Sequence, residues 1–527
     1  MPTVRRNSCE KIMGFEENVV KMQRDTVDRI SELPEFILHT ILSMLDTKEV
    51  CRACILSKRW YGAWSSVPVL DFQLRYFQKY GDYPGNCDDD TLKRFVGFVD
   101  KTMQRYSMHK YRITKMYLML PKSAEKLVSL IDKWIMIAVQ NQIQDFGIRV
   151  VGGFYYRLPE ILFCAKSLKV LKCKFVKLPY YKTMELVSLE YLTLYLDTVD
   201  EDMLQRIISS SPLVELDIKR GYRLVNISLP WMEKGNGGDK CTTSGTMQSN
   251  HQESPLQKFV YTGLGHHMPW PWNMNIVALK NLRKLEFDFA SITDDIVSEL
   301  ACGLVALESL ALSQCFNLKC IKISSNSLKQ LRIANELHFI EVTIDAPKLL
   351  EFSYNTEVET SLSLVRVPDH CNAQFLPLGS DPLTTVWLVE LKKFLEETNF
   401  FKSLVIELPN PRKILVDEDI LRNTGPPYKL SELKLCGIGA WNLGKFSVVG
   451  FLDALFRCCH PDVLSLTTSL QNPGSELILD ILNILKRKVH CYTHPLRSIE
   501  VEGADCSSLL SKPSKFEMRF RLSWCQV

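Results

Sequence analysis

The sequence predicts an α/β fold, in which a short N-terminal three-helix module precedes a solenoid of strand-containing repeats. An apolar stripe with helical spacing lies near residue 40, and an apolar motif then recurs at a nearly constant interval from about residue 110 onward. The 527 residues are 46% hydrophobic and 24% charged, values typical of globular chains. This composition excludes wholesale disorder and collagen-like repetition.

The first residues carry no regular pattern. Residues 1–24 mix charges of both signs without an apolar core segment, so we expect a flexible tail and no secretion signal. The longest unbroken apolar run, residues 134–139, is far shorter than the roughly 18 residues that a membrane helix needs. The 17 cysteines are therefore expected to be reduced thiols, in a protein of the nucleus, the cytoplasm or both.

Residues 25–70 are predicted to form three short helices. Apolar residues at helical spacing give the first helix one broad stripe: Ile37, Leu38, Ile41, Leu42 and Leu45. Pro34 fits the first turn of that helix, and Ser57 can cap the third. Trp60 and Trp64 are four residues apart and so share a face of the third helix. Residues 71–109 are expected to be linker helices.

A motif of the form L-x-x-L-x-L, or a close apolar variant, defines repeats within residues 110–370. Its first leucines are Leu168, Leu189, Leu213, Leu256, Leu282, Leu307, Leu328 and Leu349. The steps between them are 21, 24, 43, 26, 25, 21 and 21 residues, and all but one fall in the range of about 20–29 residues that leucine-rich repeats use. The alternating apolar residues predict parallel strands on a concave face, with helices such as 202–209 and 294–304, and loops, on the convex face.

The exceptional 43-residue step contains a polar insertion. Residues 233–254 hold only two apolar residues, Cys241 and Met247, too few to offset the entropy of ordering the segment. We therefore expect a disordered loop inserted into one repeat, and subtracting its 22 residues returns a step of 21.

Weaker copies of the motif extend the solenoid in both directions. They begin at Ile113, Ile143, Leu430 and Leu496. Residues 371–527 are accordingly expected to be a degenerate, repeat-like C-terminal region, because terminal repeats tend to be atypical. The alternation over residues 516–522 predicts a closing strand.

The third, fifth and seventh motif positions supply candidate binding residues. Their side chains should point away from the buried leucines and gather on one concave surface suited to holding a partner. The candidate substrate-binding residues are Lys172, Lys174, Tyr191, Tyr195, Glu215, Asp217, Lys284, Glu286 and Arg332. The two tyrosines are the strongest candidates for binding, because aromatic residues are enriched at binding hot spots. A merely solvated sheet face is the alternative.

The sequence offers no pattern for catalysis, a cofactor or a metal. Cys51 and Cys54 form a single C-x-x-C without a second pair, and the Cys458–His460 and His490–His494 groups match no standard zinc spacing. Phosphate-loop, nucleophile-elbow and zinc-protease motifs are absent. A net charge of only +4 also argues against nucleic acid as the partner.

Residues 28–64 resemble the plant F-box, in the form D-R-I-S-x-L-P-x-x-I-L-x-x-I-L-S-x-L followed by T-K-E and then L-S-K-R-W-x-x-x-W. A match of this length is very specific. One departure is Asp46, where the family usually has proline. Over nearly its whole length the chain resembles plant F-box proteins with leucine-rich repeats. The opening pattern of the FBD region that ends many of them is not found after residue 370.

The resemblance implies a non-catalytic subunit that recognises substrates for an SCF-type ubiquitin ligase. The F-box would dock on a Skp-type adaptor, and through it on cullin and RING subunits, while the repeats would bind a protein substrate. The residues expected to contact the adaptor are Leu33, Pro34, Ile37, Ile41, Leu42 and Leu45, with Leu56, Trp60 and Trp64 partly in the core of the module and partly in the contact. They could instead pack the core of the module, although some forty residues cannot bury this much apolar surface internally.

Two other functions stay open at the level of sequence. One is a repeat scaffold for protein interactions that leads to no degradation. The other is direct binding of nucleic acid or a peptide hormone on the repeats.

Overall fold

The structure is a computed structural model of the whole chain. It describes residues 32–45, 47–78, 87–153, 155–195, 198–220, 224, 227–229, 254–263, 271–274, 279–334, 341–356, 361–377, 383–407, 414–415, 425–436, 448–468, 496–502 and 516–524. The expected N-terminal tail and the inserted loop at 233–254, apart from Ser254, lie outside these residues. The described chain forms two compact units, with unit 1 spanning Met1–Thr262 and Pro271–Leu279, and unit 2 spanning Gly263–Trp270 and Lys280–Val527.

Three short helices come first among the described residues of unit 1, as the sequence predicts. They are α2 (Glu35–Met44), α3 (Thr47–Leu56) and α4 (Lys58–Ser65). The hydroxyl of Ser57 caps α4 by accepting hydrogen bonds from the backbone amides of Arg59 at 3.1 Å and Trp60 at 3.4 Å. Pro34 stands one residue before α2, so it is the N-cap residue instead of the first residue of the helix.

The main sheet of unit 1 is parallel and runs in the order β1-β2-β3-β5-β7-β9-β11. Its strands are β1 (Val69–Gln73), β2 (Lys115–Leu120), β3 (Asp145–Val150), β5 (Val170–Lys174), β7 (Tyr191–Tyr195), β9 (Glu215–Lys219) and β11 (Lys258–Thr262). Residues 71–109 differ from the predicted linker helices, because β1 pairs with β2 and is followed by α5 (Asp89–His109). Together with the start of β1 they form a first repeat, whose apolar strand residues, Leu70 and Phe72, do not follow the leucine motif.

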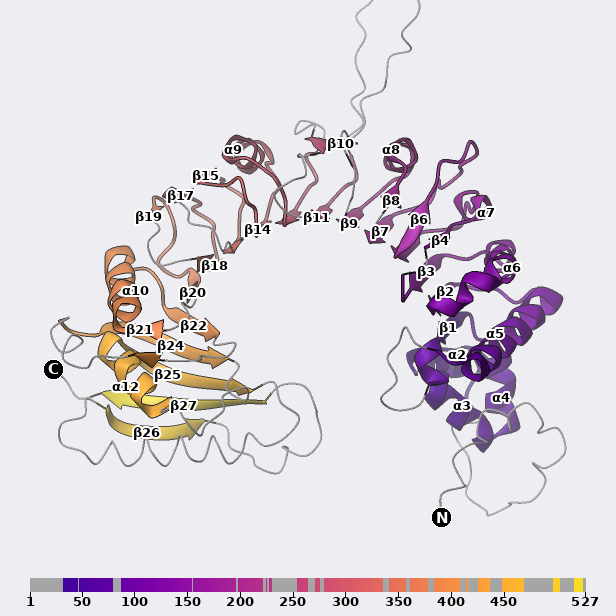
Figure 1. The fold of residues 1–527 in the computed structure, drawn as a ribbon, viewed down its shortest axis with the longest axis horizontal. Coiled ribbons are helices and arrows are strands. Elements are labelled where there is room, and N and C mark those ends of the chain that lie inside the picture. The colour runs from indigo at the N-terminus through magenta and orange to yellow at the C-terminus, as the bar shows by residue number, and fades with distance from the viewer. Residues whose placement is uncertain are drawn as a thin grey trace, which may run out of the picture. The chain divides into compact units, whose positions relative to one another are not determined.

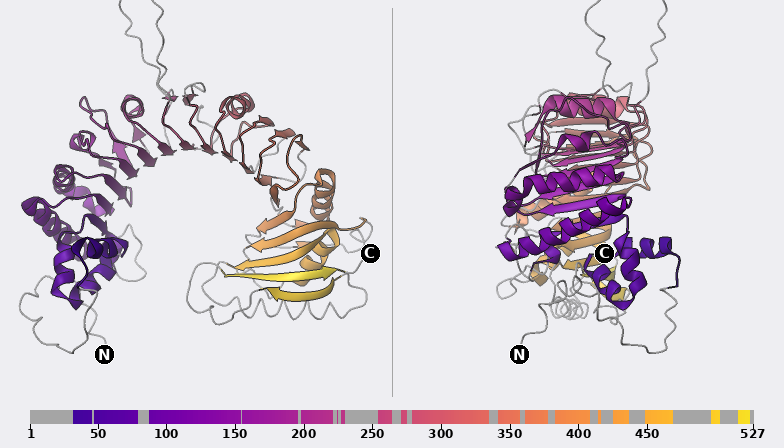
Figure 2. Two further views of the ribbon diagram at one scale, coloured as in Figure 1. Left: turned by 180° about the vertical axis from the view of Figure 1, so that it is seen from behind. Right: turned by 90° about the vertical axis from the view of Figure 1, so that its right-hand side faces the viewer.

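Helices cover one face of this sheet, and the other face is lined by strands alone (Figures 1 and 2). After α5 the covering helices are α6 (Val128–Gln140), α7 (Glu160–Phe163) and α8 (Glu201–Ser210). Short strands supplement them in two small parallel sheets: β4 (Tyr156–Arg157), β6 (Val176–Leu178) and β8 (Thr198–Val199), and β10 (Ile227–Leu229) with β12 (Trp272–Met274).

Unit 2 repeats the same plan. Its parallel strands are β13 (Lys284–Asp288), β14 (Ser309–Ser313), β16 (Gln330–Ala334), β18 (Glu351–Thr356), β20 (Asn372–Pro377), β22 (Ser403–Glu407), β24 (Tyr428–Cys436) and β25 (Cys459–Thr468). The helices are α9 (Asp294–Gly303), α10 (Thr385–Thr398) and α12 (Val448–Cys458). Two smaller sheets join β15 (Cys320–Ser324), β17 (Glu341–Asp345) and β19 (Ser361–Leu364), and β21 (Leu383–Thr384) with β23 (Ile414–Leu415).

The last two strands of unit 2 break the parallel pattern. The predicted closing strand is present as β27 (Phe516–Trp524), and it pairs antiparallel with both β25 and β26 (Leu496–Glu502). The copy that begins at Leu496 is therefore a strand of an antiparallel pair and does not continue the parallel stack. Its apolar alternation is compatible with either direction, which is why the sequence cannot distinguish them.

The leucine motif sets the register within each unit. In all eight predicted copies the strand begins two residues after the first leucine, as at Leu168 and β5. The apolar residues then align across strands, so that Leu171 is opposite Leu192, which is opposite Leu216, and all three are buried. The predicted fold class is confirmed, because stacking these ladders builds the core that no single repeat could form.

The described helices include none that is long and apolar enough to cross a membrane. Within the described residues, no group of three or more His, Cys, Asp and Glu side chains could hold a metal ion.

Replacing Leu171 by Ala should lower the free energy of unfolding by about 2–5 kcal/mol, because it leaves a cavity in a fully buried ladder. Replacing its exposed neighbour Lys172 by Ala should change that energy by less than about 0.5 kcal/mol. Denaturant unfolding followed by circular dichroism measures both values. Equal effects of the two substitutions would contradict the alternation of buried and exposed side chains.

The thiols of unit 2 should differ in reactivity. Burial raises the pKa of the Cys315 thiol to about 12, so almost none of it is the reactive thiolate at pH 8, whereas Cys302 on α9 is exposed. Brief treatment of the native protein with iodoacetamide should therefore label Cys302, and label Cys315 only after unfolding. Peptide mass spectrometry reads out both sites, and equal labelling of the native protein would contradict this burial.

Candidate functional site

The F-box helices leave large apolar side chains in solvent. Phe36 and Met44, both on α2, are 70% and 80% exposed, and Pro34 is also exposed. Leu33, Ile37, Ile41 and Leu45 are half-buried, with Leu33, Ile41 and Leu45 packed against the core of the module. Monomeric proteins seldom expose such side chains in a cluster, so this side of α2 has the character of a protein contact surface.

Two of the nine residues expected at the adaptor lie in the core of the module. Leu42 and Trp60 are only 2% and 9% exposed and pack with Leu38, Val50 and Ala63. This corrects the contact expected for Leu42, because a side chain this deep offers almost no surface to a partner. Trp60 takes the core part of its expected double role. Leu56 ends α3, and its side chain lies outside the described ones.

Trp64 joins the F-box to the first repeat. Its ring stacks on that of Phe98 in α5, with centroids 6.3 Å apart and planes 17° apart, and the guanidinium of Arg105 lies 5.0 Å from the ring centroid. The hydroxyl of Tyr106, also in α5, donates to the carbonyl oxygen of Val67. The structure thus gives Trp64, which was expected partly at the adaptor, a role in fixing the F-box on the repeats.

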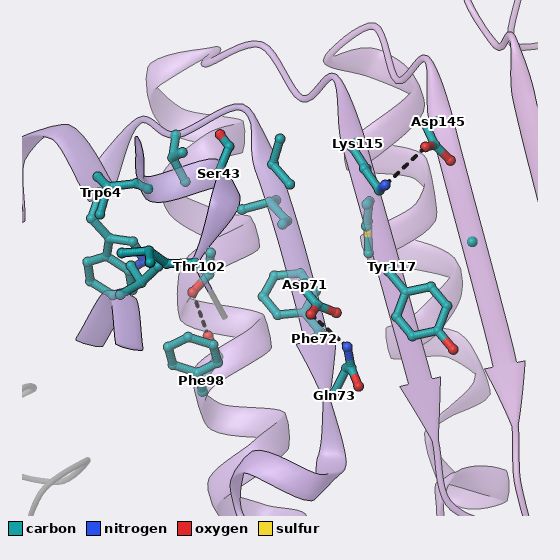
Figure 3. A pocket seen from close by; sticks show the side chains of 18 of the residues that line it. Ser43, Trp64, Asp71, Phe72, Gln73, Phe98, Thr102, Lys115, Tyr117 and Asp145 are labelled. Atoms are coloured by element: carbon teal, nitrogen blue, oxygen red, sulfur yellow. Dashed lines mark hydrogen bonds and ion pairs between the residues drawn. The ribbon is translucent and has the colours of Figure 1, made fainter. Parts of the chain in front are cut away.

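A cavity of about 400 Å³ lies where the F-box meets strands β1–β3 and β5 (Figure 3). Trp64 of the F-box and Phe98 of α5 line it with aromatic surface, and the strands contribute both apolar and polar residues. On the sheet side, the ammonium of Lys115 lies 3.4 Å from a carboxylate oxygen of Asp145.

Tyr117 owes its place in this cavity to a glycine. A Cβ atom at Gly147, the register partner of Tyr117 on β3, would lie 2.7 Å from Cδ2 of the tyrosine ring. Only glycine lets the ring lie over the neighbouring strand in this way. Burial raises the pKa of the Tyr117 hydroxyl, and the positive charges of Arg149 and Arg75 partly offset that rise.

The nine expected substrate-binding residues all stand on the open face of a main sheet, at alternating strand positions. Lys172, Lys174, Tyr191 and Arg332 are exposed, and Tyr195, Glu215, Asp217, Lys284 and Glu286 are half-buried. The six on unit 1 lie on the adjacent strands β5, β7 and β9, where Lys174 pairs with Tyr195 and Tyr191 with Glu215. The other three lie on unit 2. Their role in binding stays a prediction.

Many of the acidic side chains on these faces form ion pairs. Glu215 binds Lys258 at 3.1 Å, Asp217 binds Lys219 at 3.3 Å, and Glu286 binds Lys284 at 2.6 Å. Each pair is at least partly exposed, so it contributes only about 0–1 kcal/mol to stability.

The sequence did not indicate four residues that the structure places at these surfaces. Phe36 and Met44 stand beside the apolar stripe of α2 and reach solvent. Tyr117 and Arg149 lie on strands β2 and β3, whose copies of the motif are weak. Applying the alternation rule to those two copies would have found Tyr117 and Arg149, whereas the exposure of Phe36 and Met44 depends on how the three helices pack.

Two family models match the chain. Residues 30–72 match the F-box domain, and residues 267–394 match the At1g61320/AtMIF1, LRR domain. These matches define the class: the chain carries an F-box domain followed by a leucine-rich-repeat domain.

The relatives found among curated proteins are Arabidopsis F-box/LRR-repeat proteins, which confirms the resemblance seen in the sequence. The F-box/FBD/LRR-repeat protein At5g56420 of Arabidopsis thaliana is 31% identical over 38% of this chain and 47% of its own length. F-box/LRR-repeat protein 13 of the same plant is 28% identical over 39% and 44%, and the FBD-associated F-box protein At5g56370 is 30% identical over 45% and 50%. The chain thus spans about half the length of the curated relatives it matches.

Replacing Trp64 by Ala should loosen the junction between the F-box and α5. We expect a loss of about 1–3 kcal/mol and faster hydrogen exchange in α4 and α5, because the stacking on Phe98 and Arg105 disappears. Met108 is exposed on α5, the helix that carries Phe98 and Arg105, and Met108→Ala is the control. Unchanged exchange in the Trp64 variant would show that the ring does not hold the two parts together.

Proposed function

We propose that this protein is the substrate-recognition subunit of an SCF-type E3 ubiquitin ligase. The F-box docks on a Skp-type adaptor, which connects it to cullin and RING subunits, and the repeats hold a protein substrate. The chain itself makes and breaks no bond. It accelerates ubiquitin transfer by holding the substrate near the charged conjugating enzyme, which replaces an encounter in solution by an effectively intramolecular step. The protein acts in the nucleus, the cytoplasm or both.

The observation that carries this proposal is the exposed apolar side of α2 within an F-box domain. Pro34, Phe36 and Met44 present apolar surface that the module does not bury, next to the half-buried Ile37 and Ile41. Burying one such side chain against a partner contributes roughly 1.5–3 kcal/mol. A few of them together are enough to support a stable interface.

The open sheet faces support the second half of the proposal. In both units the alternation of side chains leaves polar, charged and aromatic residues on a broad surface next to a rigid core. A repeat scaffold without degradation would use the same surfaces. The two functions differ in whether the chain recruits adaptor and cullin.

The double variant Phe36→Asp/Met44→Asp should lose the adaptor, because two carboxylates would be buried at an apolar interface. Leu33→Ala/Pro34→Ala should weaken the same contact. Co-purification of the chain with a Skp-type adaptor and cullin measures binding, and at least a tenfold loss is expected for the Asp pair. Unfolding curves establish that the variants are folded.

Val305→Asp supplies the matched control, since Val305 is exposed to the same degree as Phe36 but lies in unit 2. It should keep the adaptor at the wild-type level. A wild-type chain that recruits no adaptor or cullin would favour the scaffold instead. Full binding by the Asp pair would place the adaptor surface away from this side of α2.

A further inference from the structure

Four adjacent strands of unit 1 carry their last outward-facing side chains in one line. Arg149 of β3 is in register with Lys174 of β5, Lys174 with Tyr195 of β7, and Tyr195 with Lys219 of β9. We call these four residues the basic row. Neighbouring strands lie about 4.8 Å apart, so the row extends over about 14 Å of the open face.

The acidic groups of this face lie outside the basic row, and each has a partner on the protein, which is a cation for three of them. Asp145 pairs with Lys115 at 3.4 Å and Glu215 pairs with Lys258 at 3.1 Å, both at the opposite ends of their strands. Asp217, one pleat away from the row, pairs with Lys219 at 3.3 Å. At the edge of the sheet, Asp71 accepts hydrogen bonds from Gln73 and Tyr76.

Three cations in and beside the row are left uncompensated. Arg149, Lys174 and Lys172, which lies two residues before Lys174 on the same face, form no ion pair with any carboxylate of the described chain. The Nε atom of Arg149 is buried and has no hydrogen-bond partner within that part of the chain. A buried donor without an acceptor is costly, and like charges on neighbouring strands repel, so an anion placed here would relieve both.

An aromatic ring stands within the row. Tyr195 lies between Lys174 and Lys219, and the guanidinium of Arg220 is 5.3 Å from its ring centroid. Arg220 adds a fourth positive charge to the three of the row, and the ring keeps an apolar surface between the cations.

The corresponding positions of unit 2 lack this character. Asp288, Ser313, Ala334 and Asn355 occupy the equivalent line across β13, β14, β16 and β18. None is a cation, so the basic row is a property of these particular strands of unit 1 and does not follow from the repeat fold alone.

We propose that the basic row, together with Lys172, binds an acidic segment of the substrate that crosses β3, β5, β7 and β9 in an extended conformation. The inference rests on the proposed function and names the class of substrate. Side chains on one face of an extended peptide are about 6.8 Å apart, so two or three carboxylates match cations spread over about 14 Å. A single phosphate would concentrate its charge of about −1.5 to −2 at one point and leave the rest of the row uncompensated.

The test uses the full chain and four labelled probes. The first is a mixture of nine-residue peptides with Glu at every second position, and the second has Gln at those positions. The third carries one central phosphoserine in place of all the Glu residues, and the fourth is a single-stranded DNA of twenty nucleotides. Fluorescence anisotropy at low and at high salt measures the dissociation constants. The Glu peptides should bind at least tenfold more tightly than each other probe and weaken as salt rises.

Reversing or removing one of these charges should reduce this preference. Lys174→Glu and Arg149→Gln are each expected to weaken binding of the Glu peptides about tenfold, the effect of losing one charge-assisted hydrogen bond. Lys322 is also exposed and lies on β15 of unit 2, so Lys322→Glu is the matched control and should change the constant less than twofold. Unfolding curves of all variants exclude a loss of fold.

The outcomes separate this proposal from the function on which it rests. Equal binding of Glu and Gln peptides, tighter binding of the phosphoserine peptides or the DNA, or no effect of Lys174→Glu and Arg149→Gln would overturn the acidic-segment site. Adaptor recruitment is measured in parallel and should stay at the wild-type level in every variant. A chain that binds the Glu peptides but never recruits an adaptor would refute the ligase function and leave the peptide site standing.

Discussion

The parallel register between neighbouring repeats is the constraint on which the rest of the molecule depends. A strand of five residues cannot satisfy its own backbone groups or bury its own leucines, so each repeat takes both from the repeat beside it. In unit 1 this requirement aligns Leu171, Leu192 and Leu216 on the buried face. The same alignment places Lys174, Tyr195 and Lys219 in line on the open face, so the chemistry of the surface is a by-product of the register that builds the core.

Much of the repeat fold could be predicted, because each copy of the motif supplies the strand that packs beside the preceding one and the period of the motif therefore gives the positions of the strands. The eight clear copies give strands that begin where the pattern places them, and α8 and α9 coincide with the helix-compatible stretches after β7 and β13. The prediction failed where the apolar alternation is present without the leucine spacing. Residues 69–73 form the first strand of the stack, and Leu496–Glu502 pairs antiparallel, which alternation alone cannot indicate.

The candidate sites divide in the same way. Strand positions follow from a period of two, so the sequence identified Lys172, Lys174 and Tyr195 as outward-facing. Helix positions in a three-helix module depend on packing angles that no local pattern contains. Leu42 and Phe36 belong to the same helix, yet the first is buried and the second is exposed. Trp64 packs against α5, which supplies Phe98 and Arg105 as its partners. The F-box sequence contains no information about either partner.

The strand order at the far end of unit 2 has a consequence for how the chain folds. β27 lies between β25 and β26, so the described strand that comes last in the sequence holds together two strands that precede it. During synthesis, β26 leaves the ribosome before the strand that pairs with it, and β25 waits with one edge unpaired. The rest of each parallel stack can grow repeat by repeat as the chain emerges, because each new strand meets a partner already made. This end of the sheet instead depends on contacts that form after β27 has emerged, and such exposed edges are where an incompletely made chain is most prone to associate with others.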